Sequence, residues 1–121
     1  MAILVLSAGR DAVLLKTRDE VLSSLGCIVT PVTSSADLVN QFFDGDHDMV
    51  VLCHSIPSDE RKRILRMIRV YRPSLRTLLI ANLNDGYGPL DIPEFGIRIP
   101  PEPEALVKAV QSIFPQASSP A

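Results

Sequence analysis

Two patterns of apolar residues alternate along the chain. Five short segments are almost continuously apolar and rich in Val, Ile and Leu, which is typical of strands buried on both faces. These segments are residues 3–6, 27–33, 49–53, 75–81 and 95–99. Most of the segments between them carry apolar residues three or four positions apart, which predicts helices with one buried face. The alternation predicts an α/β domain.

Capping residues and helix breakers give the ends of the predicted helices. Asp11, Ser34 or Ser35, and Ser58 are the expected N-caps of the first three helices, and Gly26, Gly45 and Pro73 are the expected stops. The last helix is expected over residues 102–114. The apolar residues expected on the inner faces are Val13, Leu14, Val21, Leu22, Leu25, Leu38, Val39, Phe42, Phe43, Ile64, Leu65, Ile68, Tyr71, Leu106, Val107, Val110 and Ile113.

Residues 83–94 break this alternation. They contain Gly86, Gly88, Pro89 and Pro93, which disfavour a full helix, so we expect a self-packed loop or a single turn. The apolar residues of this segment could cover part of the sheet. If they do not, they form an exposed patch that is a candidate partner or dimer surface.

Strands that alternate with amphipathic helices form a parallel sheet covered on both faces, because each right-handed crossover lays its helix across the sheet. Five strands in 121 residues fit the flavodoxin-like order 2-1-3-4-5. The functional crevice of that fold lies at the carboxyl ends of strands one and three. We expect a single domain over residues 1–114 and a flexible tail over residues 115–121.

Charge and cysteine content exclude several classes of function. A net charge of -2 gives no general attraction to nucleic acid or anionic lipid, so neither is expected as a partner. The apolar run at the N-terminus is too short for a signal peptide or a membrane span. Cys27 and Cys53 do not make a disulfide framework, which agrees with a reducing, cytoplasmic location.

Several segments, in this order and spacing, resemble the receiver domain of response regulators, the CheY-like family. They are ILVL at residues 3–6, LGCIVTPV at 25–32, DMVVLCHSIP at 48–57, RMIRVYRPSLRTLLI at 66–80 and IPPEPEALVKAV at 99–110. The resemblance extends from Ile3 to Phe114. It implies the CheY-like fold, with the fourth helix reduced or absent here. It also implies a role in two-component signal transduction, with no enzymatic activity.

The chain departs from this family at each reactive position. In the family an acidic pair follows strand one, an aspartate ends strand three, a Thr or Ser ends strand four, and a lysine before proline ends strand five. The corresponding residues here are Ser7, Ala8, Cys53, Asn82 and Ile99. Mg²⁺ takes oxygen ligands and usually one or two carboxylates. The resemblance therefore implies a pseudo-receiver that is not phosphorylated and binds neither Mg²⁺ nor another cofactor.

Further expectations concern the peptide bond before Pro100 and the roles of Cys53, His54 and His47. The family's lysine–proline bond is cis, so a cis bond is expected between Ile99 and Pro100. Consecutive strand residues point to opposite faces, so Cys53 and His54 should not meet, and Cys53 is expected to be a buried structural cysteine. His47 is expected to be a solvated loop residue too far from Cys53 to share a metal. A redox-sensing role for Cys53 remains an alternative, as does a conventional phosphorelay receiver whose acceptor lies elsewhere.

Basic residues are concentrated in and after the third helix. Seven of the twelve Lys and Arg residues lie there: Arg61, Lys62, Arg63, Arg66, Arg69, Arg72 and Arg76. Helical spacing places Lys62, Arg66 and Arg69 along one outer strip. A solvated helix face explains this strip most simply, and an acidic protein partner is the alternative. With Tyr87 and Leu90 the strip forms our candidate surface for an unidentified protein partner or a second copy of the chain.

Overall fold

A central parallel sheet organises the molecule, for which the computed structural model describes residues 2–81 and 94–117. Its five strands lie in the order β2-β1-β3-β4-β5, and every neighbouring pair is parallel. The strands are β1 Ile3–Ala8, β2 Cys27–Val32, β3 Met49–Leu52, β4 Arg76–Ile80 and β5 Gly96–Ile99. The predicted α/β class and strand order are therefore confirmed.

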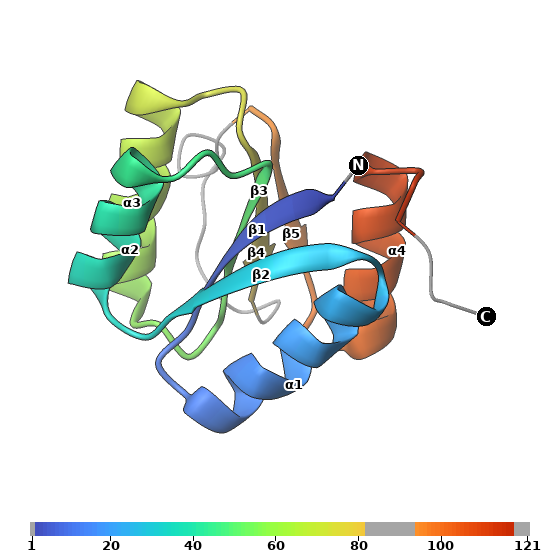
Figure 1. The fold of residues 1–121 in the computed structure, drawn as a ribbon. Helices are drawn as coiled ribbons and strands as arrows, with labels where there is room; N and C mark the ends of the chain where they lie inside the picture. Colours follow the sequence, from blue (N-terminus) through green and yellow to red (C-terminus); the bar gives the residue numbers. More distant parts are fainter. Residues whose placement is uncertain (1, 82–93, 118–121) are drawn as a thin grey trace.

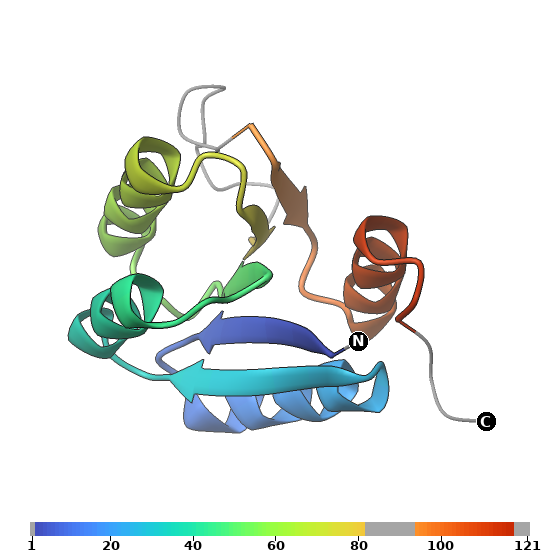
Figure 2. The same ribbon diagram turned by 45° about the horizontal axis from the view of Figure 1, so that its top comes forward.

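Helices cover both faces of the sheet. They are α1 Ala12–Ser24, α2 Ser35–Asp44, α3 Ser58–Tyr71 and α4 Pro103–Ile113. α2 and α3 lie together on one face, and α1 and α4 lie on the other (Figures 1 and 2). None of these helices, in the part of the chain that the structure describes, is long and apolar enough to cross a membrane.

The sheet separates two apolar clusters. On one side Leu6 and Leu52 of the sheet pack with Leu38, Phe42 and Leu65 of α2 and α3. On the other side Val5, Met49, Val51 and Leu78 pack with Leu22, Leu106 and Val110 of α1 and α4. Successive strand residues point to opposite faces, so each central strand contributes to both clusters. Full burial of each such side chain stabilises the fold by about 1.5–3 kcal/mol.

Local capping signals place two of the helix starts correctly. The Asp11 carboxylate accepts hydrogen bonds from the amides of Val13 and Leu14, at 3.0 and 3.2 Å. The Ser34 hydroxyl accepts one from the amide of Asp37 at 3.1 Å. The Ser58 prediction is wrong, because Pro57 is the N-cap of α3 and no side chain caps it.

Three residues expected on inner faces are exposed instead. Val13 lies on the first turn of α1 and faces solvent. The side chains of Phe43 and Tyr71 are 54% and 64% exposed and meet each other at the ends of α2 and α3. In α3 the buried row begins at Arg61 and continues through Ile64, Leu65 and Ile68, so the inner stripe is rotated away from Tyr71.

The chain reverses after β5 without a cis bond. No peptide bond in the described ranges is cis, so the expected cis Ile99–Pro100 bond is wrong. The trans form of an X–Pro bond is favoured by about 0.5–1 kcal/mol. Here the reversal is made one residue later, because the amide of Glu102 donates to the carbonyl of Pro100 at 2.8 Å in a γ-turn centred on Pro101.

The residues after α4 pack back against the domain. The amide of Ala117 donates to the carbonyl of Phe114 at 2.9 Å, and Ala117 is buried in the cluster beneath α4. Packing thus extends at least to Ala117, and the domain boundary expected at residue 114 stays a prediction. The expectation that the family's fourth helix is reduced or absent concerns residues 83–94, and all of these but residue 94 lie outside the described residues.

Candidate functional site

β1 and β3 end next to each other and bring three of the predicted site positions together. The amide of Cys53 donates to the carbonyl of Ala8 at 2.9 Å, directly beyond the paired residues Ala8 and Leu52. Ser7, Ala8 and Cys53 are all buried, and the Cys53 side chain is only 1% exposed. Ala8 faces α2 and α3, whereas Ser7 and Cys53 both contact side chains of α1. We call the α1 side of this edge the crevice.

Arg18 of α1 places its guanidinium over Cys53. Its Nη1 donates to the Sγ of Cys53, and its Nη2 donates to the Nδ1 of His54 at 3.0 Å. A guanidinium has donors only, so Nδ1 of His54 is the acceptor and the ring proton lies on Nε2. A fixed positive charge therefore lies directly beside the thiol.

The expected separation of Cys53 and His54 is wrong. Their Sγ and Nδ1 atoms are 3.9 Å apart, because β3 ends at Leu52 and both residues lie in the turn that follows. The strand rule that points neighbours to opposite faces no longer applies there. The lone pair of Nδ1 is occupied by Arg18, which leaves it unable to accept the thiol proton. This geometry does not make a cysteine–histidine nucleophile.

Ser55 and Gly9 enclose the thiol from the other directions. The Ser55 hydroxyl accepts hydrogen bonds from the amides of Arg10 and Asp11, at 2.9 and 3.2 Å, and donates to the Sγ of Cys53 at 3.1 Å. A Cβ atom on Gly9 would lie 3.0 Å from the Cβ of Cys53, closer than ordinary packing allows. The loop after β1 is thus pinned to the loop after β3.

Asp19 provides a carboxyl group beside Ser7. The Ser7 hydroxyl hydrogen-bonds to it, and one of its oxygens, Oδ1, is buried without a hydrogen-bond partner. Burial raises the pKa of Asp19, against the lowering effects of the Ser7 hydrogen bond and the Arg18 charge. Sequence reasoning missed both Arg18 and Asp19. The available signal was the position of Arg18 between Leu15 and Leu22 on the inner stripe of α1.

The residues of the crevice do not fit a magnesium ion. Mg²⁺ requires near-octahedral oxygen ligands, and Ser7, Ala8 and Cys53 provide a hydroxyl, a methyl and a thiol. Asp19 adds one carboxyl group, and the neighbouring Arg18 guanidinium repels a divalent cation. Residues 2–81 and 94–117 contain no group of three or more His, Cys, Asp or Glu side chains able to hold a metal.

The remaining predicted positions are distributed as follows. Ile99 is buried at the end of β5, where the amide of Ala81 donates to its carbonyl at 3.1 Å, and its side chain offers no donor or charge. His47 is half-buried rather than solvated, and its Nδ1 has no hydrogen-bond partner. Asn82, Tyr87 and Leu90 lie outside the described residues.

The basic strip lies on α3, with Arg66 and Arg69 exposed and Lys62 half-buried. These residues face away from the sheet, as predicted. Arg61 does not join them, because it is buried on the inner side of α3.

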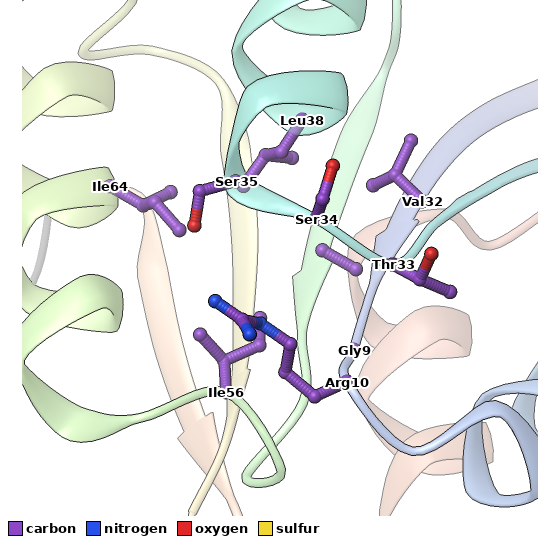
Figure 3. A pocket seen from close by; sticks show the side chains of 10 residues that line it. Gly9, Arg10, Val32, Thr33, Ser34, Ser35, Leu38, Ile56 and Ile64 are labelled. Atoms are coloured by element: carbon purple, nitrogen blue, oxygen red, sulfur yellow. The ribbon is translucent and has the colours of Figure 1, made fainter.

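On the far side of the same edge an ion-pair network joins Arg10, Glu60 and Ser35, next to a small hollow whose lining residues, Arg10 and Ser35 among them, appear in Figure 3. Arg10 donates to both carboxylate oxygens of Glu60, at 2.6 and 2.7 Å, and the Ser35 hydroxyl donates to Oε1 at 2.8 Å. The Ser35 hydrogen bond, followed by Arg10, lowers the pKa of Glu60. The hollow next to Arg10, which Ile56 and Ile64 also line, has a volume of about 10 Å³ and can hold at most one water molecule.

Two comparisons return no relative: no family model and no curated protein matches this chain. The fold is nevertheless that of CheY-like response regulator receiver domains. One receiver domain of this kind, from Methanospirillum hungatei JF-1, is 13% identical, with a TM-score of 0.68 over 93% of this chain and 94% of that chain.

Response regulator DrrB of Thermotoga maritima, an OmpR/PhoB homolog, is 26% identical with a TM-score of 0.75. The match covers 96% of this chain but 54% of DrrB, so this chain spans about half of that protein. A chain in the crystal structure of histidine kinase ThkA in complex with response regulator protein TrrA is 14% identical. Its TM-score is 0.76, over 93% of this chain and 98% of that chain.

Proposed function

We propose that this protein is a receiver-like signalling domain that is not phosphorylated and acts through protein–protein contacts rather than as an enzyme. One observation carries the proposal. At the position where the resemblance places the phosphoacceptor aspartate stands the buried thiol of Cys53, and the guanidinium of Arg18 donates to it. We propose a cytoplasmic location, where both free cysteines stay reduced.

The chemistry of phosphoryl transfer supports the proposal. Transfer to a receiver needs a carboxylate nucleophile, a metal ion that neutralises the phosphoryl oxygens, and cations that stabilise the developing charge. Cys53 supplies no carboxylate, and the single carboxyl group of Asp19 is hydrogen-bonded to Ser7. The Arg18 guanidinium provides a positive charge in the crevice that depends on neither a metal ion nor a phosphoryl group. We therefore propose that phosphorylation does not change the charge of the crevice, so that the domain presents the same surface to its partners throughout.

The class of partner is inferred by analogy. The response regulator protein TrrA forms a complex with histidine kinase ThkA. We propose that this chain likewise binds a protein of a two-component system, on the strength of the shared fold. Redox sensing by Cys53 is not favoured, because reactive thiols are partly exposed and this one is buried.

Incubation with acetyl phosphate and Mg²⁺, followed by intact mass measurement, tests the proposal. We expect no added phosphate, with an active receiver as the positive control. The Cys53→Asp variant is the sharper arm, because it restores the missing nucleophile but no metal ligand pair. We expect this variant to stay unmodified as well. A phosphate located on any aspartate of the unaltered chain, Asp19 included, contradicts the proposal.

A further inference from the structure

α2 and α3 run side by side on one face of the sheet (Figures 1 and 2), and residues of both helices line a groove between them. Two rows of side chains at four-residue spacing flank it: Ser35, Val39 and Phe43 on α2, and Arg63, Met67 and Tyr71 on α3. Residues four apart lie on the same face of a helix, so each row forms one wall. We call this hollow the α2–α3 groove.

Contacts between the helices fix both ends of the groove. At one end the Ser35 hydroxyl donates to Glu60 at 2.8 Å. At the other end the rings of Phe43 and Tyr71 meet edge to face, with centroids 5.2 Å apart. Between these ends lies a hollow of about 350 Å³, which Val39 and other residues of both walls line. From its first to its last residue each row spans eight steps of 1.5 Å, or about 12 Å, which matches two turns of a partner helix.

The groove concentrates exposed apolar surface. Among residues 2–81 and 94–117, seven large hydrophobic side chains are exposed, and Phe43, Val70 and Tyr71 are three of them. Val70 lies beside Tyr71 on α3 and is 72% exposed. Isolated exposed apolar residues are ordinary, but Phe43 and Tyr71 contact each other at one end of the groove, and adjoining exposed apolar side chains mark an interaction surface.

The two walls differ in charge. Arg63 lines the hollow and is exposed, and Arg66 is exposed about one turn further along α3, whereas α2 contains no Lys or Arg. Glu60, at the end of the groove, is already paired with Arg10 and Ser35. A ligand in the groove therefore meets positive charge on the α3 side, which complements acidic side chains.

We propose that the α2–α3 groove binds a short amphipathic helix of a protein partner. Two apolar side chains of that helix, at positions i and i+4, enter the groove, and its acidic side chains face Arg63 and Arg66. Helix-in-groove recognition uses this spacing in general. The inference deepens the proposed function and rests on it, since it names the surface and the partner chemistry of a domain that acts through protein contacts.

Three synthetic peptides test the inference by titration into the ¹⁵N-labelled protein. The first is a short helical peptide with Leu at i and i+4 and Glu at the flanking positions. The second carries Lys in place of Glu, and the third carries Ala in place of Leu. We expect the first to shift the amides of Val39, Phe43, Met67 and Tyr71. We also expect it to bind at least about tenfold more tightly than the other two, with an advantage over the Lys peptide that shrinks at high salt.

Variants identify the surface. Tyr71→Ser removes apolar area from an exposed position, and the double variant Arg63→Glu/Arg66→Glu reverses two positive charges on the α3 side of the groove. Each should weaken binding of the first peptide by about tenfold or more, because Tyr71→Ser removes an aromatic contact and the charge reversal replaces attraction of the Glu side chains by repulsion. Lys16→Glu is the matched control, because Lys16 is exposed on α1, on the other face of the sheet. The affinity of this variant for the first peptide should equal that of the unaltered chain.

Four outcomes overturn the inference. They are equal affinity for all three peptides, shifts confined to α1 or α4, shifts of the groove amides on concentration alone, and binding of phosphatidylserine vesicles to the groove without peptide binding. The third outcome would assign the groove to a second copy of the chain, and the fourth to an anionic membrane. None of the four affects the acetyl phosphate test, which depends only on the crevice.

Discussion

Removal of the Arg18 guanidinium should destabilise the protein and expose Cys53. Arg18→Met keeps an apolar stem of similar length but deletes the donors to Cys53 Sγ and His54 Nδ1. A net contribution of about 0.5–1.5 kcal/mol for each hydrogen bond predicts a loss of roughly 1–3 kcal/mol in the free energy of unfolding. With an m-value of about 1–3 kcal/mol/M, the midpoint in urea should fall by roughly 1 M.

The reactivity of Cys53 is an independent readout of the same perturbation. In a Cys27→Ser background only Cys53 can react with iodoacetamide. Its modification in the unaltered crevice requires local opening, because the side chain is 1% exposed. A loss of roughly 1–3 kcal/mol in the free energy of opening should speed modification by about 5- to 150-fold, at tenfold per 1.4 kcal/mol.

Arg66→Met is the matched control for Arg18→Met. Arg66 is exposed on α3, so its substitution should change the free energy of unfolding by less than about 0.5 kcal/mol. Cys53 should also react at its original rate in that variant. If Arg18→Met shows the same midpoint and the same Cys53 reactivity as the unaltered chain, the guanidinium does not cap the thiol and the reasoning is refuted.

Three further predictions concern packing and titration. Gly9→Ala should cost about 1–3 kcal/mol by overpacking against Cys53, measured by urea unfolding, and an unchanged midpoint would contradict the close approach. Burial raises the pKa of Asp19, so the protonated side chain stabilises the folded state in acid, and this stabilisation is lost as pH rises through the folded-state pKa. Asp19→Asn should therefore increase the melting temperature at neutral pH, and a decrease would refute this. Burial, followed by the charge of Arg72, lowers the pKa of His47, so stability should fall as pH drops below about 6.5, where the unfolded chain takes up a proton. His47→Gln should lose less stability than the unaltered chain between about pH 7 and 5 in urea titrations, and equal losses would contradict the burial effect.

Local sequence signals predicted most of the fold. The continuous apolar segments gave the five strands, and their alternation with helices gave the parallel order β2-β1-β3-β4-β5. Asp11 and Ser34 act as caps through their own nearby amides, so their role follows from a few neighbouring residues. The start of α3 at Pro57 was not predictable in this way, because it has no capping side chain.

Side-chain positions that depend on how a helix is rotated against the sheet were not predictable. Tyr71 has the spacing of an inner residue, yet tertiary packing turns Arg61 inward and leaves Tyr71 exposed. In α1 the way the helix packs on the sheet brings Arg18 over Cys53, although the two residues are 35 positions apart in the sequence. The residue types of Ser7, Ala8 and Cys53 can be read from the sequence, and the position of Arg18 on the inner stripe of α1 was also available, but the contact between Arg18 and Cys53 required coordinates.

Paramagnetic broadening by Mn²⁺ tests the central claim, that the crevice lacks the oxygen ligands a divalent cation requires. Mn²⁺ prefers the same hard oxygen ligands as Mg²⁺ and broadens amide signals close to its site. In a ¹⁵N-labelled sample we predict no selective loss of the signals of Ser7, Ala8 and Cys53 as Mn²⁺ is added. Selective broadening of these three signals, reversed by excess Mg²⁺, would contradict the account.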